Sequence, residues 1–200
     1  MMLVELTTVP GTAIPVAEFK DHLRLGTGFA DDALQDSVLE AYLRAAMSAI
    51  EARTGKMLIT RDFSWTLTAW RDLSAQALPT APVSALTSLT ITDRLGASEL
   101  VSSDKYYLEQ DMHRPRLVAS GLCLPAIPVG GKAIIVFDAG FGAAWAEIPA
   151  DLRQAVLLLA AHYYERRNGS TSGAADMPVE VGALIQRYRI VRLFGGGGAA

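Results

Sequence analysis

The segment PADLRQAVLLLAAHYYERRNG, residues 149–169, decides how the rest of the chain must fold. Pro149 suits the first turn of a helix because it has no N–H to lose, and Asp151 lies near the positive end of the helix dipole. The closing Asn-Gly pair favours a left-handed C-cap. From Ala155 to Ala161 every residue is apolar, whereas a surface helix is apolar along one stripe only. We therefore expect this helix to be buried on more than one side, either in a core or between subunits.

The composition indicates one soluble domain with a partly covered surface. The chain has 200 residues, of which 50% are hydrophobic and 20% are charged, and its mean hydropathy is +0.24. This length allows a core that needs no metal or disulfide support. No window offers the ~20 consecutive apolar residues of a membrane span. A soluble protein this apolar is expected to cover some of its surface with a partner.

The charge is mildly acidic overall but uneven. A net charge of −3 and a pI near 5.6 argue against a protein that grips phosphate backbones, which requires clustered Lys and Arg. The stretch from Gln186 to Phe194, in contrast, carries three arginines and no acid. We interpret it either as an arm that docks on another chain, or as a last strand or helix packed on its own domain. The candidate partner-binding residues are Arg187, Tyr188, Arg189, Ile190, Arg192 and Phe194.

Helical periodicity is strongest near the N-terminus and in residues 149–168. A short helix is predicted over Val16–Leu25, and a long one over 31–54, where Asp31-Asp32 caps the start and Gly55 follows the end. A last short helix is predicted after Pro178, with Val181, Leu184, Ile185 and Tyr188 on one face. The apolar stripe expected on the long helix is Leu34, Val38, Tyr42, Ala45, Ala49 and Ile50.

The middle of the chain is typical of strands. Residues 60–70 alternate between apolar and polar side chains, which is the pattern of a half-buried strand. Further strands are expected over 83–93, 106–108, 116–118 and 132–137, joined by turns as in an antiparallel sheet. Residues 1–15 are expected to be extended and loosely held.

These elements predict an α+β fold: a small helical bundle with an inserted antiparallel β region and an extended C-terminal arm. The two long helices must pack together, because each alone leaves apolar residues in water. The second face of the later helix is then covered by a β layer or by the next subunit, at Leu157, Leu158, Ala161 and Tyr164. The predicted division is one domain over 1–177, with helices at 16–25, 31–54 and 149–168 and the β region at 60–138, followed by a C-terminal segment and flexible arm over 178–200.

No catalytic or metal-binding pattern is visible. His22, His113 and His162 are scattered and lack ligand spacing, and the Gly-Gly-Lys ending at Lys132 leads into a strand instead of the helix that a phosphate loop requires. The single cysteine, Cys123, is expected to be a small buried hydrophobe. We therefore predict no cofactor, no metal and no enzymatic activity.

Four segments, in this order, resemble the head–tail connector (adaptor) proteins of tailed bacteriophages and phage-derived gene transfer agents. They are FKDHLRL near the N-terminus, DDALQDSVLEAYLRAAMSAIEARTGKMLITRDF from Asp31, AIIVFDAGFG from Ala133, and DLRQAVLLLAAHYYERRNG from Asp151. Together they span most of the chain, from Val16 to Gly169.

This resemblance implies a structural particle protein and not an enzyme. Copies would form a ring, typically of twelve, beneath the portal, extending the DNA channel and seating the tail. The implied partners are further copies of the chain, the portal and a tail-side neck or terminator protein. DNA would pass through the channel without sequence-specific binding. The C-terminal segment would reach the portal, and assembly would take place in the bacterial cytoplasm. Another neck or tail-completion protein, or a small enzyme with an unrecognised site, are the alternatives.

Overall fold

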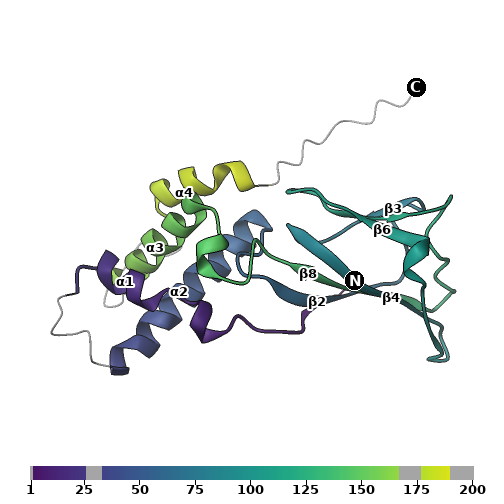
Figure 1. The fold of residues 1–200 in the computed structure, drawn as a ribbon, viewed down its shortest axis with the longest axis horizontal. Coiled ribbons are helices and arrows are strands. Elements are labelled where there is room, and N and C mark those ends of the chain that lie inside the picture. Colours follow the sequence, from purple (N-terminus) through teal and green to yellow (C-terminus); the bar gives the residue numbers. More distant parts are fainter. Residues whose placement is uncertain (1, 26–32, 167–176, 190–200) are drawn as a thin grey trace.

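Helices gather at one end of the molecule and strands at the other (Figure 1). This computed structural model describes residues 2–25, 33–166 and 177–189. Within these ranges the chain changes from one body to the other between β1 and α1, between α2 and β2, and between β8 and α3. The fold is therefore α+β, as predicted, with every strand of the β body except β1 inserted between the two long helices.

The helical body is built around α3 (Ala150–Glu165). It packs against α2 (Ala33–Thr54) on one side and α4 (Val179–Ile185) on the other, while α1 (Val16–His22) lies against α2. Residues throughout the apolar run of α3 are buried, which confirms that the helix is covered on more than one side. The fully buried side chains of this body include Phe19, Leu39, Leu43, Ile50, Leu152, Val156, Val181 and Tyr188.

The cover on the second face of α3 differs from both of the covers that we expected. Neither a β layer nor a neighbouring subunit is needed, because α4 from the same chain lies there. Three α4-side residues, Val181, Ile185 and Tyr188, are buried against the core, and Leu184 is partly buried. The helix after Pro178 was thus predicted correctly, and its described part, up to Arg189, belongs to the helical core.

Two details of the helices correct the predictions. α3 begins at Ala150, with Pro149 as the extended residue before it, and ends at Glu165, while Asn168 and Gly169 lie outside the described residues. The expected stripe on α2 is correct in part: Ile50 is buried and Tyr42 and Ala49 pack against the core, whereas Val38 and Ala45 are exposed, and the side chain of Leu34 lies outside the described residues. The stripe that is buried is Leu39, Leu43, Ala46, Met47 and Ile50. The predicted cap at Asp31-Asp32 also lies outside the described residues.

The β body is a sandwich of two antiparallel sheets. The larger sheet has the order β1-β2-β8-β4-β5 and the smaller has the order β3-β7-β6. Alternate side chains of the larger sheet, such as Phe63, Trp65 and Ile135, face the smaller sheet and form a second apolar core with Leu117. The bounds are β1 Met2–Glu5, β2 Arg61–Leu67, β3 Ala75–Ala77, β4 Val83–Thr92, β5 Ser98–Leu100, β6 Tyr106–Glu109, β7 Arg116–Ala119 and β8 Lys132–Ala139.

The N-terminal segment is ordered, in contrast to the prediction. Residues 2–5 form β1, the edge strand of the larger sheet, in register with residues 63–66 of β2. A single 3-10 turn, Gly11–Ala13, follows and leads into α1. All four β1 side chains are exposed, so the segment has no apolar alternation that could reveal a strand. The sequence analysis also missed β3 and β5, because each strand has only three residues, too few to show an alternating pattern.

The two bodies meet through backbone contacts. Ile59 and Gly142 form an isolated parallel bridge, and the amide of Met57, just after α2, donates to the carbonyl of Ala81, just before β4, at 2.8 Å. Gly140 has a φ of 149°, and a Cβ there would collide with the backbone of Thr60. The glycine-rich segment after β8 is therefore a close turn, as predicted, because only glycine allows the chain to pass Thr60 at this point.

Candidate interaction surfaces

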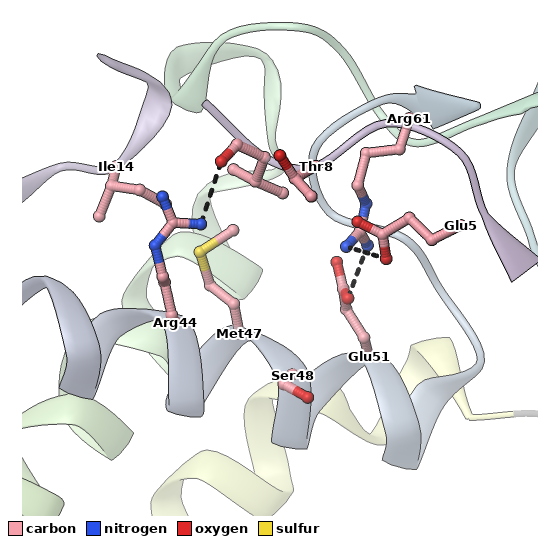
Figure 2. A pocket seen from close by; sticks show the side chains of 9 residues that line it. Glu5, Thr8, Ile14, Arg44, Met47, Ser48, Glu51 and Arg61 are labelled. Carbon is pink, nitrogen blue, oxygen red and sulfur yellow. Dashed lines mark hydrogen bonds and ion pairs between the residues drawn. The ribbon is translucent and has the colours of Figure 1, made fainter. Parts of the chain in front are cut away.

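A buried arginine joins the N-terminal strand to both bodies (Figure 2). Arg61, the first residue of β2, forms ion pairs with Glu51 of α2 at 2.7 Å and with Glu5 of β1 at 3.1 Å. Glu51 also accepts a hydrogen bond from the amide of Leu58 at 2.9 Å. Burial raises the pKa of the Glu51 carboxyl, and the Arg61 charge partly opposes this rise. This arrangement fixes β1 in place and offers no reactive group.

A second arginine holds the chain that follows β1. Arg44 of α2 donates from Nη1 to the carbonyl of Val9 at 3.0 Å, and its Nε donates to Glu40 at 2.7 Å. Figure 2 shows Arg44 and Arg61 at opposite ends of a pocket whose floor is α2, with Met47 and Ser48 between them. Both guanidinium groups are occupied by contacts within the chain, so we assign this pocket an anchoring role.

The C-terminal residues that were predicted to bind a partner divide into three groups. Tyr188 is fully buried and packs edge-on against Phe141, with ring centroids 6.1 Å apart. Its hydroxyl donates to Asp151 at 2.8 Å, and burial raises its pKa. The ring of Tyr188 thus completes the helical core, and its predicted contact with a partner stays a prediction.

Arg187 and Arg189 remain available at the surface. Arg187 pairs with Asp151 at 3.1 Å, yet 69% of its side chain is exposed, and Arg189 is exposed beside Gln186. Ile190, Arg192 and Phe194 lie outside the described residues. The partner-binding role of these five residues stays a prediction.

The four residues predicted at subunit or core contacts lie in or against the helical core. Leu157 is buried, whereas Leu158, Ala161 and Tyr164 are partly buried. Tyr164 meets Tyr42 of α2 edge-on, with centroids 6.0 Å apart. Leu158 and Ala161 instead line a pocket, so part of the apolar surface of α3 stays open to solvent.

Two pockets lie on opposite flanks of α4. The first, which we call the basic groove, is lined by Arg53 of α2, by Arg189, and by the outer α4 residues Val179, Ala183 and Gln186. The second, the acidic groove, lies beside the end of α3 and is lined by Glu165, Glu180, His162, Leu158, Ala161 and His22. Sequence reasoning missed both grooves, because each combines residues from elements that are distant along the chain.

Exposed apolar side chains also gather at the end of the β body that is distal to the helices. Leu95, Leu122 and Val129, in the turns and loops that join strands at this end, are 82%, 98% and 97% exposed. Cys123 lies beside Leu122 and is exposed, which corrects the prediction that it is buried. Its neighbour Leu124 is buried in its place, so the apolar character of this loop was read correctly but assigned to the wrong residue.

The described ranges contain neither a candidate metal site nor a helix that could cross a membrane. No three His, Cys, Asp or Glu side chains there converge on a possible metal site. None of the helices described has the length and apolar character that crossing a bilayer requires. The open features are thus surfaces and grooves.

Three chains of solved structures align with nearly the whole chain. One comes from "Neck of empty GTA particle computed with C6 symmetry", with 56% sequence identity, a TM-score of 0.89 and coverage of 98% of this chain and 99% of the other. A second, from "Virion of native gene transfer agent (GTA) particle", has 56% identity, a TM-score of 0.86 and the same coverage. A third, from "Neck of native GTA particle computed with C12 symmetry", has 52% identity, a TM-score of 0.83 and again the same coverage. No model of a known protein family and no curated protein sequence matches the chain.

Proposed function

The chain belongs to the family of neck proteins of gene transfer agent particles, and from this membership we propose that it is the head–tail adaptor of such a particle. It is a structural component of the neck, between head and tail, and not an enzyme. In the proposed role, copies form a ring beneath the portal, extend the DNA channel and provide a seat for the tail. The near-complete alignment at 56% identity is the observation that carries this proposal.

Ring formation is supported by the symmetry of the related assemblies. The matched neck structures were computed with C6 and with C12 symmetry, and both are compatible with a closed ring of identical subunits. We propose twelve copies. Each copy in such a ring needs two different contact surfaces, one for each neighbour, because a rotational repeat pairs unlike faces.

The portal contact is proposed for the C-terminal segment. Tyr188 is anchored in the helical core, so it fixes the point from which the following residues leave the body. Arg187 and Arg189 are exposed there, and Ile190, Arg192 and Phe194 follow in the sequence. An arm of this composition suits docking on a larger acidic neighbour, since complementary charge guides association.

The net charge of the protein is consistent with a role in lining a DNA channel. A net charge of −3 is unsuited to tight, non-specific binding of the duplex, which depends on clustered cations. A mildly acidic ring would let DNA slide without stopping it. We therefore propose passage of DNA without sequence-specific contacts.

Site-specific photo-cross-linking in assembled particles tests the portal contact. A cross-linking residue placed at Arg189 or Phe194 should couple to the portal, and one placed at the exposed Leu122 in the distal loops serves as the matched control. Deletion of residues 190–200 should leave the thermal midpoint unchanged and reduce the number of tailed particles, because Tyr188 stays in the core.

The same cross-linking experiment distinguishes the adaptor role from the second candidate function, a tail-completion protein. Cross-links from these positions to a tail-terminator protein, and none to the portal, would replace the adaptor assignment with a tail-completion role.

A further inference from the structure

We propose that neighbouring copies of this chain contact each other through the two flanks of α4, with the basic groove of one copy facing the acidic groove of the next. This inference rests on ring formation in the proposed function and assigns the surfaces that form the ring. The observation behind it is the opposite charge of two pockets on a single short helix.

The helical geometry places the two grooves on different sides of α4. Val181, Ile185 and Tyr188 share one face and are buried in the core. Val179, Ala183 and Gln186 recur at the same helical spacing and form a separate exposed stripe, which lines the basic groove. Glu180 projects to the remaining side, toward the end of α3, and lines the acidic groove. One copy therefore offers both surfaces at once.

The charges that line each groove have the same sign, and none of them faces an opposite charge from the described part of the chain. Arg53 and Arg189 line the first groove without a carboxylate beside them, and Glu165 and Glu180 line the second without Lys or Arg. None of these four side chains takes part in an ion pair with another described residue. All four are exposed, and Arg189 also donates a hydrogen bond to Gln186 at 3.3 Å.

Apolar surface accompanies the charges in both grooves. Val179 is 83% exposed at the basic groove, and nothing lies within 4 Å of the position where a Cβ of Gly182 would point. Leu158 and Ala161 supply partly buried apolar surface at the acidic groove. Each groove thus pairs an apolar centre with charges at its margin, which is the usual composition of a protein interface.

A second copy fits the basic groove better than the C-terminal residues of the same chain do. Residues 190–200 contain Arg192 and no acid, so their charge is the wrong sign for the basic groove. A heterologous contact between identical subunits requires two unlike, complementary surfaces, and the two grooves meet that requirement in sign.

Charge reversal in particle-producing cells tests the pairing. One variant, R53E/R189E, makes both grooves acidic, and another, E165R/E180R, makes both basic. Each alone should reduce the copies of the chain per particle at least about tenfold, because like charges then face each other at every contact. Produced together, the two variants should restore assembly as alternating copies, since each acidic groove again meets a basic one. The four-fold variant R53E/R189E/E165R/E180R should also assemble.

The controls separate assembly from folding. R94E/R114E makes the same change in net charge at exposed sites on the β body and should assemble normally. Thermal midpoints of the purified variants should match the wild type, because the substituted side chains are exposed. If a charge reversal prevents folding, the alanine variants R53A/R189A and E165A/E180A replace it, because they remove the charges with a smaller perturbation. The number of copies of the chain per particle is measured in the same way.

Two results would overturn the pairing. The first is that either single-groove variant assembles as well as R94E/R114E. The second is that the mixture fails to restore rings although both variants fold, as would happen if a groove bound the portal or another protein. Arg189 also belongs to the proposed portal contact, so the E165R/E180R variant, which leaves that residue unchanged, separates the two proposals. Rings that obey the charge pattern but cross-link only to tail proteins would refute the portal assignment and leave the pairing intact.

Discussion

The N-terminal segment, residues 2–9, pairs with the β body and then reaches α2, whereas the C-terminal segment, residues 177–189, packs on the helical body, and different forces hold the two. Every N-terminal side chain up to Thr8 is exposed, and the segment is held by the sheet hydrogen bonds of β1 and by contacts from Arg44 and Arg61. The C-terminal segment buries Val181, Ile185 and Tyr188. Apolar burial is the stronger of the two, so the segment expected to be an arm is the more firmly attached one.

Tyr188→Ala should have the largest effect. Removing a fully buried aromatic ring leaves a cavity between α3 and the turn after α4, and truncations of this size cost about 3–5 kcal/mol. Chemical denaturation should show this loss in the free energy of unfolding. Tyr188→Phe, which keeps the ring and removes the bond to Asp151, should lose only about 1 kcal/mol. A near-neutral Y188A variant would show that the C-terminal segment is not part of the core.

Arg61→Ala should be the next most harmful change. It leaves the buried Glu51 carboxylate without its cation, and breaking a buried pair in this way costs about 3 kcal/mol. Glu5 should lose its attachment as well, so amides of β1 should exchange hydrogen faster than in the wild type. Unchanged exchange in β1 would mean that backbone pairing with β2 alone holds the strand.

Glu51→Gln should alter how stability depends on pH. A carboxyl whose folded pKa is raised above 4.5 contributes its full stabilisation only below that pH and loses it as the pH rises through the folded pKa. Gln cannot ionise, so the stability of E51Q relative to the wild type should increase between about pH 4 and pH 7. Denaturation curves across this range measure the difference. A relative decrease would show that the Arg61 pair outweighs burial.

Arg44→Ala should loosen the N-terminal segment with a modest loss of about 1 kcal/mol, because one hydrogen bond to the carbonyl of Val9 disappears from a half-exposed site. Arg44→Lys retains a charge at this position and provides the control. Proteolysis near Val9 should accelerate in the Ala variant. Protection equal to the wild type would assign the anchoring to the apolar side chains nearby.

Arg187→Ala should have the smallest effect on stability, at most about 0.5 kcal/mol, because its pair with Asp151 is largely in water. The contrast with Tyr188, the adjacent residue, is the sharpest test of what holds the C-terminal segment. Thermal melting of the two variants side by side measures it. A loss for R187A close to that of Y188A would mean that the ion pair, and not the ring, positions the turn.

The strongest sequence patterns predicted the fold correctly. The all-round apolar run in residues 155–161 identified a doubly covered helix, and the alternation in 61–67 identified the central strand β2. The stripe on α2 was misplaced in part because Val38 and Leu39 are both apolar, and periodicity alone does not decide which of two adjacent stripes is buried. β1 was missed because its strand character comes from pairing with β2, more than fifty residues away.

Much less of the interaction surface was predictable. The exposed Arg187 and Arg189 were found from charge alone, while the burial of Tyr188 depends on Asp151 and Phe141, which only the folded chain brings near. Arg53 and Arg189 both line the basic groove although they lie far apart in the sequence, so no local pattern could have linked them. Local signals thus located helices and strands, whereas surfaces built from distant residues required the three-dimensional arrangement.

The close passage of Gly140 past Thr60 has a mechanical consequence. Layers of side chains yield under load by changing rotamers, but two backbones in direct contact have no such freedom. With the bridge between Ile59 and Gly142 beside it, this junction should behave as a stiff coupling. A rearrangement of side chains therefore cannot relieve a displacement of the chain at this point.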